Sequence, residues 1–271
     1  MGNTTSQNRR TCDERARSGQ RWRPGALAQD PGQGPQDWGR LIVFPHAGGA
    51  VGFYRPLRRV IDGASVLAVQ YPGRQDRIRE AQLTSVEQIA TSVISELERV
   101  PRMTTVLMGH SMGALAAFEV ARRRPDLADG LIVSAHRAPS VPSRSTLHLA
   151  DDAALLEETR AMGGTDEEVL AHPDLVQLII AHLRADLAVD AAYLCPPGER
   201  LSVSVTVMRG SQDTSVTAED ARAWDLHTES PSEQLCLTGG HFYLLDRRAE
   251  VVGVLGEEMT RARARAEERT S

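Results

Sequence analysis

A serine between two glycines is the first feature of this sequence whose residue types and spacing could do chemistry. Ser111 is the centre of a Gly-x-Ser-x-Gly pattern that Gly109 and Gly113 complete. An apolar run typical of a strand precedes the pattern, and a stretch typical of a helix follows it. This context predicts a tight turn that exposes the serine hydroxyl as a nucleophile. We expect both glycines to be structural, because side chains there would collide with the strand and the helix.

A nucleophilic serine needs a base, and the base needs an acidic group that orients it. When the serine occupies such a turn, the acid and then the histidine follow it in the chain. Asp213 follows the apolar run 203–208, and His241 follows the run 234–237 and two glycines. Both residues would lie at the sheet edge that carries Ser111. We therefore expect Ser111, Asp213 and His241 to be the catalytic residues.

Other acids and histidines fit these roles less well. Asp220 and Asp225 lie in predicted helix, and Asp246 follows the histidine, against the expected order. His227 and His136 are better explained as ordinary loop histidines. The remaining histidines lie next to the serine, in the first loop or in a later insertion, and none follows a late strand: His46, His110, His148, His172 and His182.

An attacked carbonyl develops a negative oxygen that needs two backbone N–H donors. Met112, directly after the serine, is expected to supply one. The helix that begins there adds the positive end of its dipole, which stabilises negative charge. Ala47, in the glycine-rich loop 45–49, is expected to supply the other. A phosphate cradle is the alternative for this loop, but the loop lacks both the P-loop lysine and the Gly-x-Gly-x-x-Gly spacing.

The elements that must position these residues read as strands alternating with helices. Near-continuous apolar strands of this kind predict an α/β fold with a mostly parallel central sheet covered by helices on both faces. Sites in such folds lie at the carboxyl ends of the strands. The predicted strands are Leu41–Phe44, Ser65–Val69, Thr104–Met108, Leu131–Ala135, Val203–Met208 and Gln234–Leu237.

Three segments depart from this alternation. Residues 1–38 are rich in Gly, Pro, Gln, Ser and Arg, which predicts a flexible arm before a single domain at 39–271. Residues 139–198 read as helices without a clear strand, an insertion that could serve as a lid; Asp151 or Asp152 could begin one helix and Pro173 another. A final helix is expected at 249–269, with a solvated end.

Composition excludes several classes of protein. The chain has 271 residues, of which 41% are hydrophobic and 25% charged, and its formal net charge of −5 argues against nucleic acid as a partner. Three scattered cysteines favour neither a disulfide framework nor a metal site, so we expect no metal and a reducing, cytoplasmic setting. No signal-peptide core and no run of eighteen apolar residues is present, so no membrane association is expected.

Six motifs together resemble the type II thioesterases that accompany polyketide synthases and nonribosomal peptide synthetases. In chain order they are FPHAGG, YPGRQDR, GHSMGA, GGTDEEVL, LRADL and GGHFYL, within about residues 41–255. The resemblance implies an α/β-hydrolase core with a mobile helical lid. It also implies a triad of Ser111, Asp213 and His241, with an oxyanion hole from Ala47 and Met112. The long arm and Thr214, where a proline commonly follows the aspartate, depart from the family pattern.

The activity implied by this resemblance is hydrolysis of acyl groups from phosphopantetheine arms. The partners would be acyl or peptidyl carrier protein domains and small acyl-thioester substrates, with no cofactor of the enzyme's own. Because carrier domains are generally acidic, local arginine clusters could dock them, although ordinary solvated surface explains any single arginine. The candidate clusters are Arg55, Arg58 and Arg59, and Arg74, Arg77 and Arg79.

Three other readings stay open at this point. A generic carboxylesterase would share the triad but prefer oxygen esters. A terminal product-releasing thioesterase domain would cyclise or release an end product, and a non-enzymatic member would only bind a partner. The substrate pocket is equally open, because helix residues of the insertion could line it or form helix core. These residues are Leu178, Ile179, Ile180, Leu183 and Leu187.

Overall fold

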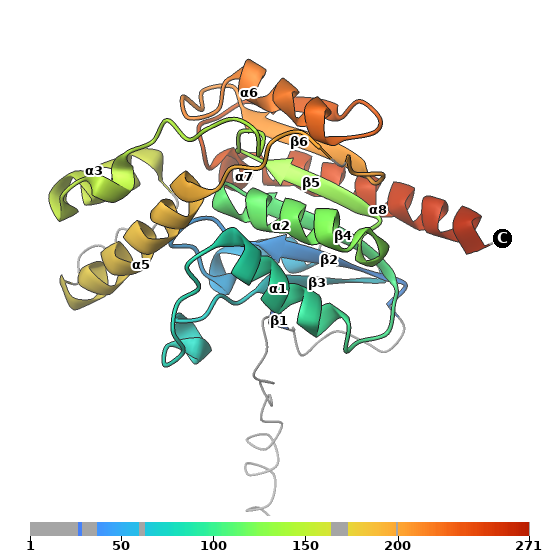
Figure 1. The fold of residues 1–271 in the computed structure, drawn as a ribbon, viewed down its shortest axis with the longest axis horizontal. Coiled ribbons are helices and arrows are strands. Elements are labelled where there is room, and N and C mark those ends of the chain that lie inside the picture. Colours follow the sequence, from blue (N-terminus) through green and yellow to red (C-terminus); the bar gives the residue numbers. More distant parts are fainter. Residues whose placement is uncertain (1–26, 29–36, 60–62, 164–172, 199, 271) are drawn as a thin grey trace, which may run out of the picture.

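The computed structural model describes residues 27–28, 37–59, 63–163, 173–198 and 200–270. Its centre is a sheet of seven described strands in the order β1-β3-β2-β4-β5-β6-β7 (Figure 1). All neighbouring strands are parallel except β1 and β3. The bounds are β1 Leu27–Ala28, β2 Gly39–Phe44, β3 Ala64–Val69, β4 Thr104–His110, β5 Gly130–Ser134, β6 Ser204–Gly210 and β7 Glu233–Leu237.

This sheet confirms the predicted α/β architecture, and each of the six predicted strands is present. β1 was not predicted: within the segment expected to be a flexible arm, Leu27 and Ala28 pair with Val69 and Ala68 of β3. Two residues are too few to show strand periodicity in a sequence. The rest of residues 1–36 lies outside the described residues.

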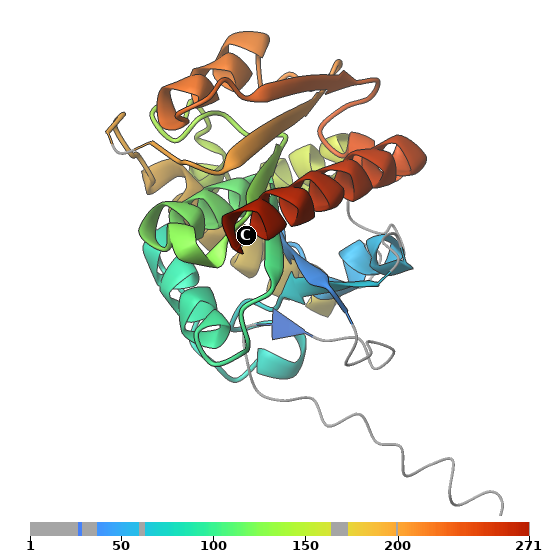
Figure 2. The same cartoon turned by 90° about the vertical axis from the view of Figure 1, so that its right-hand side faces the viewer.

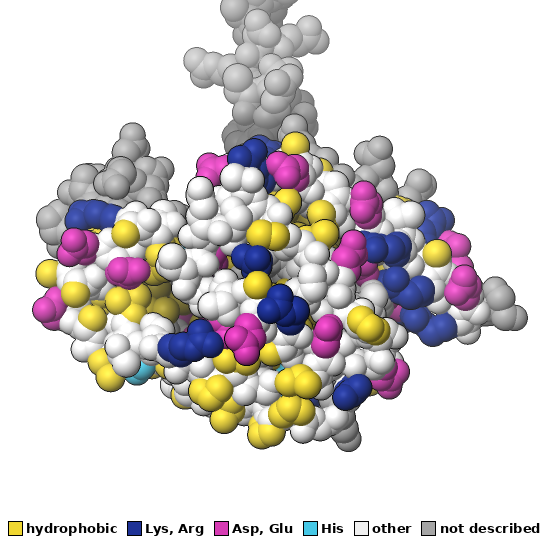
Figure 3. All heavy atoms as spheres, turned by 90° about the horizontal axis from the view of Figure 1, so that it is seen from above, with side chains coloured by type: hydrophobic (Ala, Val, Ile, Leu, Met, Phe, Trp, Pro, Cys, Tyr) yellow, Lys and Arg dark blue, Asp and Glu magenta, His cyan; other side chains and the backbone are white. Residues whose placement is uncertain are grey.

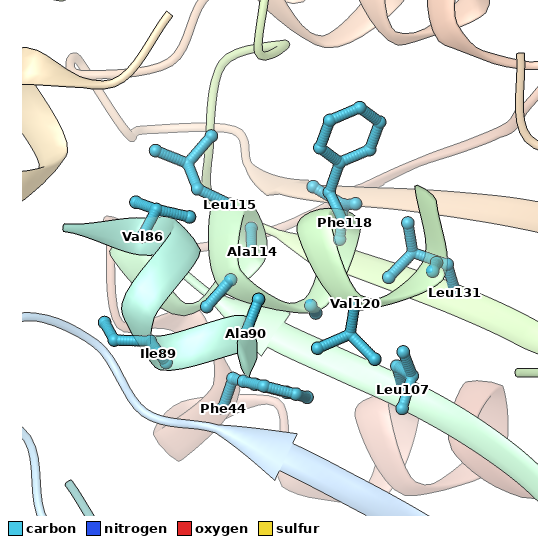
Figure 4. Close-up of a cluster of buried hydrophobic side chains, with 14 of the residues drawn as sticks. Phe44, Val86, Ile89, Ala90, Leu107, Ala114, Leu115, Phe118, Val120 and Leu131 are labelled. Atoms are coloured by element: carbon cyan, nitrogen blue, oxygen red, sulfur yellow. The ribbon is translucent and has the colours of Figure 1, made fainter. Parts of the chain in front are cut away.

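Helices cover both faces of the sheet because the strand side chains alternate between them. Leu41 and Val43 of β2 pack with α8 on one face, whereas Ile42 and Phe44 pack with α1 and α2 on the other. Figure 2 shows α8 along one side of the sheet, and Figure 4 shows the cluster around α1 and α2. The bounds are α1 Val86–Leu97, α2 Met112–Arg123 and α8 Arg248–Thr270. α8 contains the C-terminal helix that the sequence predicts at 249–269.

Helices also follow β5, where the sequence predicts an insertion. α3 (Asp152–Met162) and α5 (Pro173–Ala192) project beyond the carboxyl ends of the strands, at the left of Figure 1. Asp151 caps α3, because its Oδ1 accepts the N–H of Ala154 at 2.8 Å. The motif residues 164–170 lie outside the described residues. The shorter described elements are η1 Val51–Arg59, η2 Gln75–Arg77, η3 Pro125–Leu127, η4 Leu147–Leu149, α6 Ala218–Arg222, η5 Ala223–His227 and α7 Tyr243–Asp246.

No helix in the described ranges combines the length and the apolar composition that crossing a bilayer requires.

A buried histidine makes the stability of this fold depend on pH. His227 is 1% exposed, and its Nε2 lies 2.9 Å from the Ser140 hydroxyl. Burial lowers the pKa of His227 from 6.5 to about 4, so between these values the unfolded chain binds a proton that the folded chain does not. The free energy of unfolding should therefore fall as pH is lowered from about 6.5 to about 4.

The His227→Gln variant isolates this contribution. Glutamine can keep a polar contact with Ser140 but does not titrate, so thermal unfolding of the variant should depend less on pH in this window than that of the wild type. The matched control is His148→Gln, at a half-buried position in η4, which should keep the wild-type dependence. Identical slopes for the wild type and His227→Gln would contradict the prediction.

Candidate active site

Ser111 lies on a strained turn between β4 and α2. Its φ of 53° and ψ of −131° are costly for a residue with a side chain, and such strain persists where the surroundings enforce it. Close packing explains the flanking glycines. A Cβ at Gly109 would lie 2.3 Å from the Gly113 carbonyl oxygen, and one at Gly113 would lie 2.1 Å from the Phe44 carbonyl oxygen. The backbone of the turn therefore packs directly against β2 and the first turn of α2, and the serine lies at the apex of the turn.

Asp213 and His241 meet in the loops that follow β6 and β7, at the sheet edge that also carries Ser111. His241 Nδ1 lies 2.9 Å from Asp213 Oδ2, and the two side chains are 11% and 2% exposed. The loops that carry them are in contact, because the Gln212 N–H donates to the Gly239 carbonyl at 2.8 Å. A Cβ at Gly210 would lie only 2.3 Å from the Gly240 carbonyl oxygen. The pair is therefore held by backbone contacts as well as by its own hydrogen bond.

Ser215 is a partner of this pair that sequence reasoning missed. Its N–H and its hydroxyl both donate to Asp213 Oδ1, at 2.9 and 2.6 Å, and the hydroxyl lies 3.1 Å from His241 Nδ1. Burial favours a raised pKa for Asp213, but the hydrogen bond and charge of His241 and the bonds from Ser215 outweigh it, so the pKa is lowered. Asp213 is thus ionised at neutral pH. A serine two residues after an aspartate is a recognisable turn signal.

Ser111 and His241 line one cavity, which has a volume of about 80 Å³. The described contacts include no hydrogen bond between Ser111 and His241. Ala47 also lines the cavity, whereas Met112 begins α2 directly after the serine and is buried. The lining residues are His46, Ala47, Gly48, Ser111, Thr159, Met162, Gly163, Ile179, Leu183, Leu187, His241 and Phe242.

The loop of Ala47 is a tight turn packed over a histidine. The Gly49 N–H donates to the His46 carbonyl at 2.9 Å, and Gly48 has a φ of +72°. The His46 ring lies beneath the turn, with its Nδ1 2.8 Å from the Tyr54 hydroxyl. Burial lowers the pKa of His46 to about 3, with smaller contributions from the charges of His241 and an arginine. A neutral His46 therefore supports the loop without adding a charge beside His241.

A second buried histidine precedes the nucleophile. His110 Nδ1 lies 2.9 Å from the Ser134 hydroxyl, which in turn lies 2.6 Å from the Tyr243 hydroxyl. Burial lowers the pKa of His110 well below its usual value, as do the charges of neighbouring histidines. This chain of polar contacts ties the end of β4 to β5 and α7. Nothing in the local sequence indicated it.

α3 and α5 form the apolar wall of the cavity. Ile179, Leu183 and Leu187 of α5 face it. Ile180 instead packs in a small core with Leu155 of α3, and Leu178 is 44% exposed. The helix residues that the sequence left open are thus divided among cavity wall, helix core and solvent.

The structure corrects one of the arginine clusters. Arg74 is 6% exposed and forms an ion pair with Asp186 of α5, so it is no surface docking residue. Arg77 donates to Glu80, whereas Arg55 and Arg79 are exposed. The side chains of residues 58 and 59 lie outside the described residues. On the face shown in Figure 3, basic and acidic side chains are interspersed rather than gathered into one basic field.

The described residues contain no group of three or more His, Cys, Asp and Glu side chains placed to hold a metal ion.

Comparison with known proteins gives consistent matches. Residues 39–258 match the thioesterase domain family. The chain is 38% identical over 209 residues to the probable cadicidin biosynthesis thioesterase of Streptomyces griseus, and the match covers 76% of this chain and 58% of that protein. It is 36% identical over 228 residues to Thioesterase PikA5 of Streptomyces venezuelae, with 81% and 80% covered.

Solved structures agree with these sequence matches. The type II thioesterase BorB from the borrelidin biosynthetic cluster is 37% identical to this chain, with a TM-score of 0.78. The match covers 86% of this chain and 97% of that one.

Proposed function

This chain belongs to the thioesterase domain family, and from that membership we propose that it is an editing thioesterase of a polyketide or nonribosomal peptide pathway. Its fold is the α/β-hydrolase fold of the type II thioesterases. The substrates are acyl groups on the phosphopantetheine arm of acyl or peptidyl carrier domains, and small acyl thioesters. Hydrolysis of such groups clears synthases that have stalled or been loaded wrongly.

One observation carries this proposal. Ser111, on its strained turn, lines the same largely apolar cavity as His241. Nδ1 of His241 contacts the buried carboxylate of Asp213. A nucleophile, a base and an orienting acid therefore converge beside a chamber whose wall suits an acyl chain. α3 and α5, the helices that follow β5, supply part of the wall of this chamber.

The reaction begins when Ser111 Oγ attacks the thioester carbonyl carbon and His241 takes the serine proton. Nε2 is the ring atom that receives it, because Nδ1 contacts Asp213. The N–H groups of Met112 and Ala47 stabilise the oxyanion. When the tetrahedral intermediate collapses, the carbon–sulfur bond breaks and His241 protonates the leaving thiolate. A water molecule, deprotonated by His241, then attacks the acyl-serine. The ester carbon–oxygen bond breaks, His241 returns its proton to Ser111 Oγ, and the carboxylic acid leaves.

The remaining features of the proposal follow from the sequence. The chemistry uses no cofactor beyond the phosphopantetheine of the partner. Residues 39–271 form the catalytic domain, with residues 139–198 as its lid insertion. Residues 1–38 are an arm, of which Leu27 and Ala28 add a strand to the sheet of the domain. The scattered cysteines suit the reducing cytoplasm as the compartment, and the acidic net charge gives no reason to invoke nucleic acid.

A substrate panel tests the function. Acyl groups of graded length are offered as carrier-protein thioesters, as N-acetylcysteamine thioesters and as p-nitrophenyl esters, and released acid is measured by mass spectrometry. We expect kcat/KM to be higher for the thioesters than for the oxygen esters of the same acyl group. A preference for oxygen esters would indicate a carboxylesterase, and cyclised products would indicate a terminal release domain. Failure of a fluorophosphonate to label Ser111 would indicate a non-enzymatic protein.

A further inference from the structure

A carboxylate of α5 contacts the loop that carries Ala47. Asp186 Oδ2 accepts the N–H of Gly48, the residue after Ala47, at 2.8 Å. The same oxygen forms an ion pair with the Arg74 guanidinium. Asp186 is 8% exposed and Arg74 6% exposed. A residue 138 positions away in the chain thus holds one backbone amide of the turn.

Arg74 holds the same turn by its other side. Its NH1 donates to the Gly49 carbonyl, and its guanidinium lies 5.1 Å from the centre of the Tyr71 ring. The Tyr71 hydroxyl donates to the Pro45 carbonyl at 3.0 Å, at the beginning of the loop. Asp186, Arg74 and Tyr71 therefore contact three successive parts of residues 45–49.

The turn needs such support because of its composition. Gly48 and Gly49 have no side chains to pack, and glycine has the largest conformational freedom of any residue. An amide donor stabilises a developing oxyanion only when it is placed within hydrogen-bond distance of it in advance. Leu183, one turn before Asp186 on α5, also packs on this site, since a Cβ at Gly48 would lie 3.3 Å from its Cδ1.

We propose that Asp186, together with Arg74, is a positioning residue that holds the Ala47 N–H in place to receive the oxyanion. The inference rests on the proposed function, because it assigns a role within the same reaction. It makes α5 part of the catalytic apparatus: one face of the helix lines the acyl chamber through Leu183 and Leu187, and the same face fixes the loop opposite Ser111.

Asp190 offers a matched control one turn further along α5. Its carboxylate is also largely buried, at 14% exposed, and also pairs with an arginine, because its Oδ1 lies 2.7 Å from Arg137 NH1. Its Oδ2 lies 2.8 Å from His136 Nε2 at the end of β5. Asp190 therefore anchors the same helix to the core with the same chemistry, but it does not bond to residues 45–49.

The experiment compares Asp186→Ala with Asp190→Ala in the full chain, because alanine, unlike asparagine, leaves no side-chain oxygen to accept the Gly48 N–H. Three quantities are measured: kcat and KM with an acyl-N-acetylcysteamine thioester, the second-order rate of Ser111 labelling by a fluorophosphonate, and the melting temperature. Losing an oxyanion donor outright costs about 100- to 1000-fold in kcat, so loosening one should cost about 10- to 100-fold. We expect that loss of kcat and a parallel loss of labelling rate for Asp186→Ala, with KM changed by less than about threefold. Asp190→Ala should lower the melting temperature without either loss.

A double variant guards against a failure to fold. Asp186→Ala alone leaves the buried Arg74 without its counter-charge, whereas Arg74→Gln combined with Asp186→Ala removes both charges together. The double variant should still show the loss of kcat and of labelling rate. The inference is overturned if Asp186→Ala and Asp190→Ala lose kcat equally, if the loss lies in KM alone, or if labelling is unchanged. Should the wild type label but hydrolyse no thioester, the proposed function fails, while the ratio of labelling rates still decides the role of Asp186.

Discussion

Replacing Ser111 by alanine is expected to lower kcat for an acyl-N-acetylcysteamine thioester by about six orders of magnitude. The substitution removes the atom that forms the acyl-enzyme, so His241 and Asp213 have no nucleophile to activate. The oxyanion donors and the acyl chamber remain, and they should leave a residual acceleration of about 1000- to 10,000-fold over the uncatalysed reaction. Thiol release is followed spectroscopically, and circular dichroism establishes that the variant is folded.

A nearby serine serves as the control for this substitution. Ser211 is exposed and precedes Asp213 by two residues, so Ser211→Ala should keep nearly the wild-type rate. Intact-mass measurement after treatment with a fluorophosphonate should show one adduct on the wild type and on Ser211→Ala, and none on Ser111→Ala. Turnover by Ser111→Ala within tenfold of the wild type would exclude Ser111 as the nucleophile.

The Asp213→Asn variant should lose about 10,000-fold in kcat. The reason lies in the two donors of Ser215. Its N–H and hydroxyl need an acceptor where Oδ1 now lies, so the amide oxygen of the replacement takes that place and the NH2 group faces His241 Nδ1. An NH2 group there favours the tautomer with its proton on Nε2, and that nitrogen can then no longer accept the proton of Ser111.

Asp225 provides an unusually close control for Asp213. Its Oδ1 accepts the N–H and the hydroxyl of Ser232, at 2.8 and 2.6 Å, which reproduces the contacts that Ser215 makes to Asp213. In the described part of the chain, Asp225 has no hydrogen bond with a histidine. Asp225→Asn should therefore keep the wild-type kcat, measured with the same thioester. If Asp213→Asn stayed within tenfold of the wild type, another group would have to orient His241.

The strands and the candidate triad could be predicted because their signals are local. The nucleophilic role of Ser111 is indicated by the two glycines that lie two positions before and after it. Asp213 and His241 each come shortly after an apolar run that predicts a strand. The structure brings Asp213 and His241 into contact and puts Ser111 and His241 on one cavity. Their catalytic roles, and those of Ala47 and Met112, stay predictions that the substitutions above test.

Contacts between distant segments could not be predicted in this way. Arg74 reads as one of several arginines in an exposed loop, and only the arrival of α5 turns it into the buried partner of Asp186. The apolar residues of α5 pose the same problem: Ile179 and Ile180 are neighbours in the chain, yet one lines the cavity and the other packs against α3. Which side each faces depends on where the helix is docked, which the composition of the helix does not determine.

The pairing of β1 with β3 bears on how the chain can be shortened. The family match begins at residue 39, so a truncation designed on that boundary would delete Leu27 and Ala28. The outer side of β3 would then present N–H and C=O groups that lack partners, and bare strands of this kind recruit strands from other molecules. A fragment cut at the family boundary thus risks self-association in solution, through a defect remote from its chemistry.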